Sequence, residues 1–305
     1  MKLNLKNGFW LGFSYAALAT IIWSGNFLVA RGLHLKAGPL DIAFWRWTIT
    51  VLVIFPFTLR AILRERRELK RHIVYLAIAS ILGVSVFNTL LYLAGQTTTT
   101  LNLSLISITF PVFTIILTRV FLKEHITAAM TTGIFIIIIG VLLLISKGNV
   151  ESLLSLTFTV GDLWMLIASL IFAVYSLLVK HRPDEISPLG FLGSTFILGW
   201  IFLAPFYFLG KNNLPLTSFD TITIVSFLYI GIFASIVAYF LWNRSVDLLG
   251  PSKASMIYYS IPLFSGLLAF IFLDEKVNLV HLISGLLIIF GILVATGKVS
   301  KKGKT

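Results

Sequence analysis

One cation lies inside a long apolar segment of this chain. Arg46 stands between Trp45 and Trp47 in the apolar run 41–59. If that run crosses a membrane, the charge costs about 2.5–3.5 kcal/mol near the bilayer centre, which marks the residue as functional or as one that reaches toward the surface. Two interpretations stay open. The guanidinium binds a substrate carboxylate with its fork of donors, or it anchors the helix at the interface beside the two tryptophans.

Two prolines occupy matching positions in two similar stretches. Ser104–Glu124 and Ser255–Glu275 lie 151 residues apart and are identical at eight of 21 positions, including Pro111 and Pro262. Proline kinks a helix because it removes a backbone hydrogen bond. In a membrane the freed carbonyl needs a neighbour or cavity water. We therefore expect both prolines to line a cavity and to flex, with a static packing kink as the alternative.

Polar and aromatic side chains within other apolar runs complete the candidate site. An asparagine in hydrocarbon needs a hydrogen-bond partner, and a wall of tyrosine, tryptophan and asparagine suits an apolar or aromatic zwitterion. For each single residue, ordinary bonding between helices is the alternative. The candidate substrate-binding residues are Trp23, Asn26, Arg46, Asn88, Tyr92, Ser107, Pro111, Phe172, Tyr175, Tyr239, Trp242, Asn243, Tyr258, Tyr259 and Pro262.

The composition sets the environment of these residues. The 305 residues are 58% hydrophobic and only 12% charged, whereas a soluble domain has roughly 25% charged residues. The apolar runs do not alternate as strands would, so we predict an all-α membrane protein. Ten segments are long enough to span a bilayer: Phe9–Ala30, Asp41–Leu59, Ile73–Gln96, Leu103–Leu122, Ile126–Ser146, Gly161–Lys180, Pro188–Gly210, Thr221–Asn243, Ser252–Leu273 and Val277–Gly297.

The positive charges test this count and give an orientation. With ten spans, 18 of the 24 lysines and arginines lie on the side of the termini, five lie on the other side, and Arg46 lies within a span. Cytoplasmic loops are rich in such residues, so we expect both termini in the cytoplasm. The same rule explains the net charge of +12, and we do not expect nucleic-acid binding.

The two halves predict an inverted repeat. Each half holds five spans, so the second enters the membrane from the opposite side, as in many secondary transporters. At a spacing of 149, Trp23 matches Phe172, Asn26 matches Tyr175 and Pro39 matches Pro188. We expect a first repeat over residues 1–146, a linker over 147–160, a second repeat over 161–297 and a basic tail over 298–305. Inversion places Glu124 and Glu275 at opposite faces as helix-end charges, with proton coupling as the alternative.

Several chemistries have no support in the sequence. The chain has no cysteine, and its five histidines form no pair at ligand spacing. We expect no metal site, no cofactor and no catalytic residues. A membrane-embedded enzyme would need a convergent cluster of acidic residues and histidine, and an ATP-driven pump would need a phosphate-binding loop. A non-transporting scaffold would leave the paired prolines without a purpose.

In this order and in duplicate, these motifs resemble the ten-helix EamA branch of the drug/metabolite transporter superfamily. The residues that carry the resemblance are Ala-x-x-Ile-Trp-Ser-Gly-Asn-Phe at 19–27, Pro39 with Phe44-x-Arg46, Pro111 with Glu124, Phe172-Ala-Val-Tyr175, and Pro262 with Glu275. The one departure is Trp23-Ser-Gly-Asn26, where the family more often has Trp-Gly-x-Asn. The resemblance covers the chain from Phe9 to Gly297.

The resemblance implies a carrier in the cell inner membrane. Members of the family are usually exporters of small metabolites such as amino acids, and they work by alternating access around a central cavity lined by the first four spans of each half. The fifth and tenth spans pack outside and often contribute to homodimer contacts. We therefore expect an amino acid efflux carrier, with a carrier for a nucleoside, a vitamin or S-adenosylmethionine as the alternative.

Overall fold

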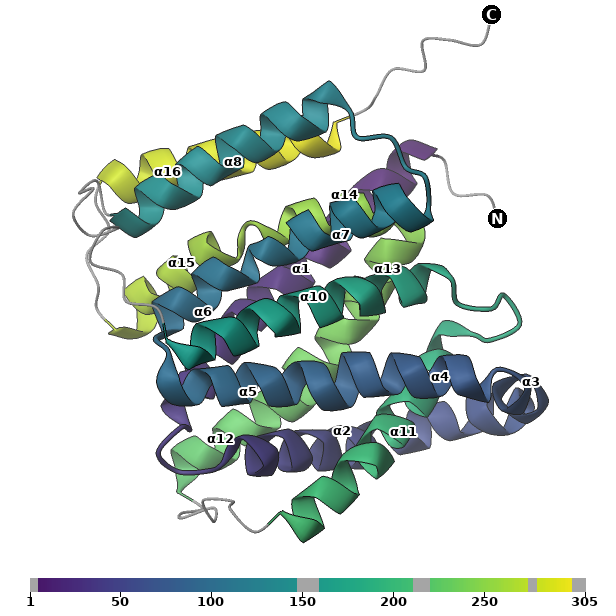
Figure 1. Cartoon of the computed structure of the whole chain (residues 1–305). Coiled ribbons are helices and arrows are strands. Elements are labelled where there is room, and N and C mark those ends of the chain that lie inside the picture. Colours follow the sequence, from purple (N-terminus) through teal and green to yellow (C-terminus); the bar gives the residue numbers. More distant parts are fainter. Residues whose placement is uncertain (1–4, 147–158, 211–219, 274–278, 298–305) are drawn as a thin grey trace, which may run out of the picture.

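The computed structural model describes residues 5–146, 159–210, 220–273 and 279–297. Within these ranges the chain is helical and contains no strand. Figure 1 shows the helices stacked side by side as one bundle. The elements are α1 (Leu5–Gly32), α2 (Pro39–Arg64), α3 (Arg66–Arg71), α4 (Ile73–Ser80), the π-helix η1 (Ile81–Val86), α5 (Phe87–Thr97), α6 (Thr100–Ser107), α7 (Thr109–Phe121), α8 (Ala128–Ser146), α10 (Val160–Lys180), α11 (Pro188–Leu209), α12 (Thr221–Leu228), the π-helix η2 (Tyr229–Val237), α13 (Ala238–Leu249), α14 (Pro251–Tyr258), α15 (Ile261–Leu273) and α16 (Leu279–Thr296).

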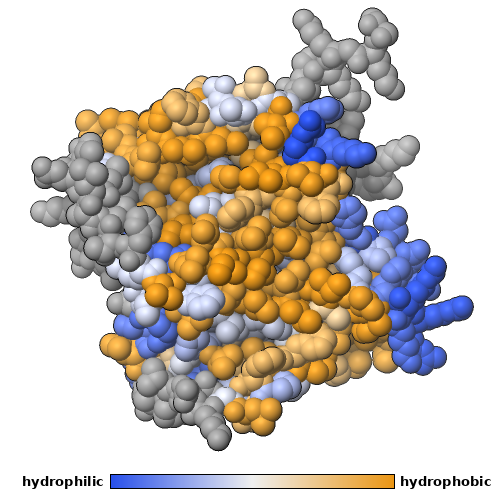
Figure 2. Space-filling view, in the orientation of Figure 1, coloured by the Kyte–Doolittle hydropathy of each residue, from blue (hydrophilic) through white to orange (hydrophobic). Residues whose placement is uncertain are grey.

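The prediction of an all-α membrane protein is confirmed. In the described ranges, eight helical stretches are long and apolar enough to cross a membrane, and Ala128–Leu144 is a shorter apolar helix. The predicted ninth span is divided between α14 and α15. Figure 2 shows hydrophobic residues over most of the visible face, with hydrophilic residues gathered at the end where α3 lies. The predicted linker and tail, and Glu275, lie outside the described residues except for the last two linker positions.

Local signals set where the helices begin. Pro39 and Pro188 occupy the first turn of α2 and α11, where a missing N–H costs nothing. The hydroxyl of Ser187 accepts the N–H of Gly190 at 3.1 Å as an N-cap. The predicted second span ends at Leu59, while α2 continues as a helix to Arg64. Arginine is a good helix former, so the helix continues past the apolar run.

Two helix breaks fall just before the paired prolines. α6 ends at Ser107 and α7 contains Pro111 in its first turn, while α14 ends two residues before α15, which contains Pro262 at its second position. Hydroxyls next to the breaks bond to nearby carbonyls, with Thr109 donating to Ile106 at 2.6 Å and Ser260 donating to Ile257 at 2.6 Å. Each break lies within one turn before a proline, where the sequence predicts a kink.

Residues at the repeat spacing contact each other in the core. Trp23 and Phe172 meet edge to face with ring centroids 5.3 Å apart. The amide of Asn88 donates to the hydroxyl of Tyr239 at 3.1 Å, across a separation of 151 residues. A repeat axis brings equivalent residues of two halves together, so these contacts support the inverted repeat expected from the sequence.

Helices α8 and α16 pack on each other along one side of the bundle (Figure 1). Their backbones approach closely at Gly133, where an added Cβ would lie 2.5 Å from the backbone nitrogen of Ala295 and 2.6 Å from the carbonyl oxygen of Gly291. Small residues at such crossings are how membrane helices associate, because lipid supplies no hydrophobic force between them.

This contact predicts a loss of stability in Gly133→Val. The valine side chain would meet backbone atoms that cannot move aside, so we expect the free energy of unfolding of the purified protein to fall by about 1–3 kcal/mol. Gly8→Val is the matched control, because nothing lies within 4 Å of a Cβ at that position. Thermal unfolding in detergent measures both variants. Equal melting temperatures would contradict the close packing of α8 on α16.

Candidate functional site

The side chain of Arg46 points into the centre of the bundle and is 1% exposed. Its Nε donates to the Oγ of Ser235 at 2.7 Å, and its Nη2 donates to the carbonyl oxygen of Ala234 at 3.1 Å. Its Nη1 donates to the hydroxyl of Tyr92 at 2.8 Å and lies 3.5 Å from the Oδ1 of Asn26. These contacts use four of the five N–H donors of the guanidinium.

This buried cation has only neutral partners. Among the described residues, no carboxylate forms an ion pair with Arg46, whose contacts are hydroxyls, an amide and a carbonyl. The guanidinium also lies over the rings of Trp47 and Tyr92, at 5.2 and 5.9 Å from their centroids. The interface-anchor interpretation is wrong, because both Arg46 and Trp47 are buried. A buried charge without a counterion is well placed to attract an anion.

A small cavity lies directly beside the guanidinium. Its space for a water-sized sphere is about 10 Å³, which is about one water molecule. A metabolite does not fit in that volume. The residues that line the cavity are Trp23, Asn26, Phe27, Arg46, Phe87, Asn88, Leu91, Phe172 and Tyr258.

Aromatic rings form most of the remaining wall. Phe172 lies at their centre, stacked on Phe87 with centroids 4.5 Å apart and 5.0 Å from Phe110. Trp23 lies 5.4 Å from Trp242, and its Nε1 donates to the carbonyl oxygen of Ala234 at 2.9 Å. Rings in such offset and edge-to-face arrangements hold one another in place. The wall is therefore apolar and shaped by large rings, with Arg46 at its polar end.

Asn88 adds an acceptor to the same wall. Its Nδ2 donates to Tyr239 at 3.1 Å, while its Oδ1 is buried and has no partner among the described residues. The hydroxyl of Tyr239 in turn donates to the carbonyl oxygen of Gly83 at 2.6 Å. Gly83 lies in η1, and a Cβ there would lie 2.3 Å from the ring of Tyr175. A buried acceptor without a hydrogen bond destabilises the protein, so the Oδ1 of Asn88 is suited to accept a hydrogen bond from a bound molecule.

A polar contact joins the two halves at the end of the bundle opposite α3. The Nζ of Lys36, in the loop between α1 and α2, lies 2.5 Å from the Oδ2 of Asp220, which caps α12. The hydrogen bond from Lys36, together with those from Thr223, holds the pKa of Asp220 well below its usual range. Asp220 is therefore ionised at neutral pH and the contact is a true ion pair.

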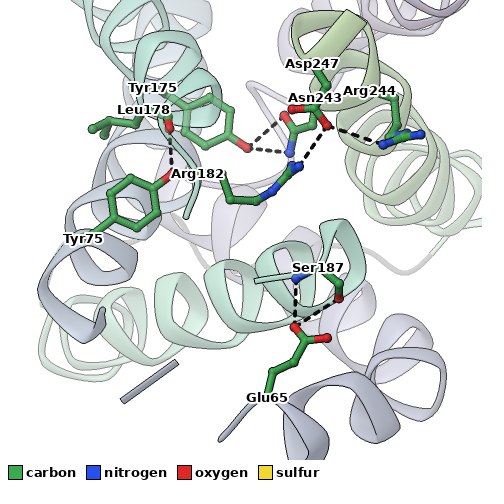
Figure 3. A network of polar contacts seen from close by, with 9 residues as sticks. All are labelled: Glu65, Tyr75, Tyr175, Leu178, Arg182, Ser187, Asn243, Arg244 and Asp247. Carbon is green, nitrogen blue, oxygen red and sulfur yellow. Dashed lines mark hydrogen bonds and ion pairs between the residues drawn. The ribbon is translucent and has the colours of Figure 1, made fainter. Parts of the chain in front are cut away.

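Two further contacts join the halves at the end that carries α3. Burial raises the pKa of Glu65, but hydrogen bonds from Arg64 and Ser187 outweigh it and leave the pKa below the usual value. Glu65 accepts from the backbone N–H of Ser187 at 2.9 Å, as Figure 3 shows. The carboxylate of Glu124 accepts from the hydroxyl of Ser252 at 2.5 Å. The predicted helix-end role of Glu124 thus includes a side chain from the other half.

A polar network within the second half lies at the same end (Figure 3). Arg182 and Arg244 lie 3.1 and 3.5 Å from the Oδ2 of Asp247. Tyr175 and Asn243 exchange hydrogen bonds of 3.2–3.3 Å nearby. The network joins the loop after α10 to α13 at this end of the bundle.

The structure brings most of the predicted site residues together around one cavity. Six line the cavity: Trp23, Asn26, Arg46, Asn88, Phe172 and Tyr258. Five contact those six: Tyr92, Ser107, Tyr175, Tyr239 and Trp242. Asn243 pairs with Tyr175 toward the end that carries α3. The other three, Pro111, Pro262 and Tyr259, are buried but do not line this cavity, so the expectation that both prolines line it is not met.

Sequence reasoning missed several residues of the site. Phe27, Phe87 and Leu91 line the cavity, but nothing separates them from other apolar residues of a membrane helix. Ser235 and Ala234 hold Arg46 from η2, and no local pattern marks a π-helix. The starts of the two π-helices, Ile81 and Tyr229, are separated by nearly the repeat spacing. The repeat is therefore the one sequence signal that relates these two elements. π-Helical turns are frequent at functional sites.

A comparison with protein families gives two matches to one family model. The model, described as the EamA-like transporter family, matches residues 10–146 and again 159–297. The two matches divide the chain close to the predicted linker.

Two similar proteins and one solved structure match this chain over almost its whole length. The chain is 27% identical to an uncharacterized transporter, YyaM, from Bacillus subtilis, covering 94% of this chain and 92% of that one. It is 28% identical to an uncharacterized transporter from Archaeoglobus fulgidus, covering 92% and 96%. A solved structure described only as a crystal structure of a protein superposes with a TM-score of 0.74 at 17% identity, covering 95% and 96%. That likeness shows a shared fold.

Proposed function

Because this chain belongs to the EamA-like transporter family, we propose that it is a secondary active transporter of small organic metabolites that carry a carboxylate, most simply amino acids. The observation that carries the proposal is the buried guanidinium of Arg46, which has no carboxylate partner among the described residues and borders the central cavity. A substrate carboxylate would supply the missing charge. Charge-assisted bonds of this kind are about twice as strong as neutral ones.

The rest of the wall suits the other parts of an amino acid. The unpartnered Oδ1 of Asn88 is an acceptor for a substrate ammonium group. The rings of Trp23, Phe172 and Tyr258 favour an apolar or aromatic side chain and attract a cation through their faces. A zwitterion would thus meet a donor, an acceptor and an apolar surface within one cavity. A nucleoside, vitamin or S-adenosylmethionine carrier is the alternative substrate class.

We propose that transport proceeds by alternating access. The cavity has room for about one water molecule, so substrate can enter only if one closure opens. The Lys36–Asp220 pair closes one end, and the Glu65–Ser187 and Glu124–Ser252 contacts close the other. Each contact joins the two halves. Rocking of the halves would break one set while it keeps the other, which is how inverted-repeat carriers expose a central site to each side in turn.

The proposed setting is the cell inner membrane, with both termini in the cytoplasm. The support is the excess of lysine and arginine on the terminal side. The basic helix α3 lies at the end of the bundle where α1 begins and α16 ends (Figure 1). The proposed direction, export, rests on the resemblance of the motifs to family exporters, and so does the proposed homodimer through α8 and α16.

A thermal-shift comparison of matched ligands tests the substrate class. Purified protein is heated with each amino acid of a panel, with the corresponding amide and with the corresponding amine, which lacks the carboxylate. A ligand at 100 times its Kd stabilises the folded state by about 2.7 kcal/mol, so at least one amino acid should raise Tm by several degrees while its amide and amine should not. Equal shifts for the carboxylate and the amide would contradict the role of Arg46. Shifts only for nucleosides or vitamins would favour the alternative.

A further inference from the structure

A second pocket lies at the end of the bundle that carries α3, away from the central cavity. It encloses about 660 Å³ between the last turns of α2, the start of α11 and α13. Three arginines line it, and no acidic residue is among the described residues that do. The lining residues are Phe57, Arg60, Ala61, Arg64, Ser187, Pro188, Leu189, Phe240 and Arg244. The proposed function gives this pocket no role.

Both long walls of the pocket change from apolar to cationic in the same direction. Along α2, Phe57 is followed one turn later by Arg60 and two turns later by Arg64. Along α13, Phe240 is followed one turn later by Arg244. Both helices run toward the end that carries α3 (Figure 1). The rings therefore lie at the level of the apolar band and the guanidinium groups lie at the polar end.

The charge in the pocket is only partly neutralised. Arg60 is exposed and makes no ion pair or hydrogen bond with another described residue. Arg64 contacts Glu65 at 2.8 Å, so that pair is neutral. Arg244 shares the single carboxylate of Asp247 with Arg182. Two positive charges thus lack a counter-charge around the pocket.

We propose that this pocket binds one anionic phospholipid of the cytoplasmic leaflet. The arginines would hold the phosphate through charge-assisted hydrogen bonds, and the rings below them would pack against the first part of an acyl chain. The choice of a lipid over a soluble phosphate follows from the walls. Phe57 is 72% exposed and Leu189 is 44% exposed, so both face the surrounding hydrocarbon of a membrane-spanning chain. Basic pockets between membrane helices on this side are the form that sites for lipid head groups take.

The test measures binding of dioleoyl-phosphatidylglycerol to the purified full-length protein by native mass spectrometry. Dioleoyl-phosphatidylcholine, which has the same chains without net charge, and glycerol phosphate, which has no chains, are the comparison ligands. A basic residue near an anionic surface contributes about 1 kcal/mol, which is about fivefold in Kd. We expect Arg60→Gln to weaken phosphatidylglycerol binding about fivefold, and the triple variant Arg60→Gln, Arg64→Gln, Arg244→Gln to weaken it about 100-fold.

A matched triple variant separates a pocket from general surface charge. Arg66, Arg67 and Lys70 are exposed residues of α3 that do not line the pocket. Replacing all three with glutamine removes the same charge and should change Kd less than twofold. Equal weakening by both triple variants, or no preference for phosphatidylglycerol over phosphatidylcholine, would overturn the proposal. Glycerol phosphate binding as tightly as the lipid would overturn the lipid in favour of a soluble anion. Arg60→Gln decides the matter if the triple variant does not fold, since its side chain has no partner to lose.

Discussion

Arg46→Gln is expected to weaken substrate binding by at least tenfold without unfolding the protein. A hydrogen bond to a charged group contributes about 1.5–3 kcal/mol, so loss of the guanidinium–carboxylate contact should raise the Kd of the substrate by at least tenfold and up to about 150-fold. The stability of the substrate-free protein should fall little or even rise. The buried charge has no counterion among the described residues, and removal of such a charge offsets the lost hydrogen bonds.

Two observables separate substrate binding from a structural role. The first is Tm without substrate, which a structural arginine would lower strongly when it is replaced. The second is the rise in Tm on adding substrate, which should fall to half or less in Arg46→Gln at the same substrate concentration. Arg46→Lys keeps the charge and loses the planar fork, so it should show an intermediate shift. A variant that melts at a much lower temperature but keeps its substrate-induced shift would contradict the assignment.

Joining Lys36 to Asp220 is expected to stop transport completely. The natural chain contains no cysteine, so Lys36→Cys with Asp220→Cys introduces the only two thiols. A short reagent with two thiosulfonate groups would bridge them, and both positions are accessible, with side chains 32% and 45% exposed. A bridge across the two halves at this end prevents the opening that alternating access requires. Transport should fall to the level of empty liposomes and return when dithiothreitol cleaves the bridge.

Three controls accompany the bridged protein. Each single cysteine variant binds the reagent without forming a bridge and should keep its transport. A second cysteine pair, Glu68→Cys with Arg71→Cys, can be bridged within α3, where the natural side chains lie 3.7 Å apart, and should also keep its transport. Full transport by the bridged Lys36–Asp220 variant would contradict movement of the two halves at that closure.

The elements of this fold were largely predictable from composition and spacing. Apolar runs of spanning length became helices because a bilayer leaves the backbone no other partner. The paired prolines marked the two helix breaks, since proline removes the same hydrogen bond in each copy. The end of α2 was not predictable from hydropathy, because Arg60 and Arg64 continue the helix beyond the apolar run. The sequence also pairs Pro56 with Pro205 at a spacing of 149, a further repeat signal.

The site was predictable in its residue types and much less in its contacts. Arg46 stood out because charge is rare in a span, and Asn26, Asn88 and Trp23 because they are polar or amphipathic. Which of these residues face one cavity depends on how each helix is rotated about its own axis. A π-helix has wider turns than an α-helix, so it changes the direction in which the following side chains point. The partnership of Arg46 with Ser235 and Ala234 arises from η2. Apolar cavity residues such as Phe87 carry no sequence signal of their own.

Counterflow in proteoliposomes tests the central claim most directly. Vesicles that contain the purified protein are loaded with one unlabelled amino acid and diluted into the same amino acid with a radioactive label, and the panel covers all amino acids. We predict saturable accumulation of label for at least one amino acid, absent from empty vesicles and reduced at least tenfold in Arg46→Gln. No accumulation for any amino acid, from protein that is folded by its thermal unfolding, would contradict a carrier of carboxylate-bearing metabolites with Arg46 at its site.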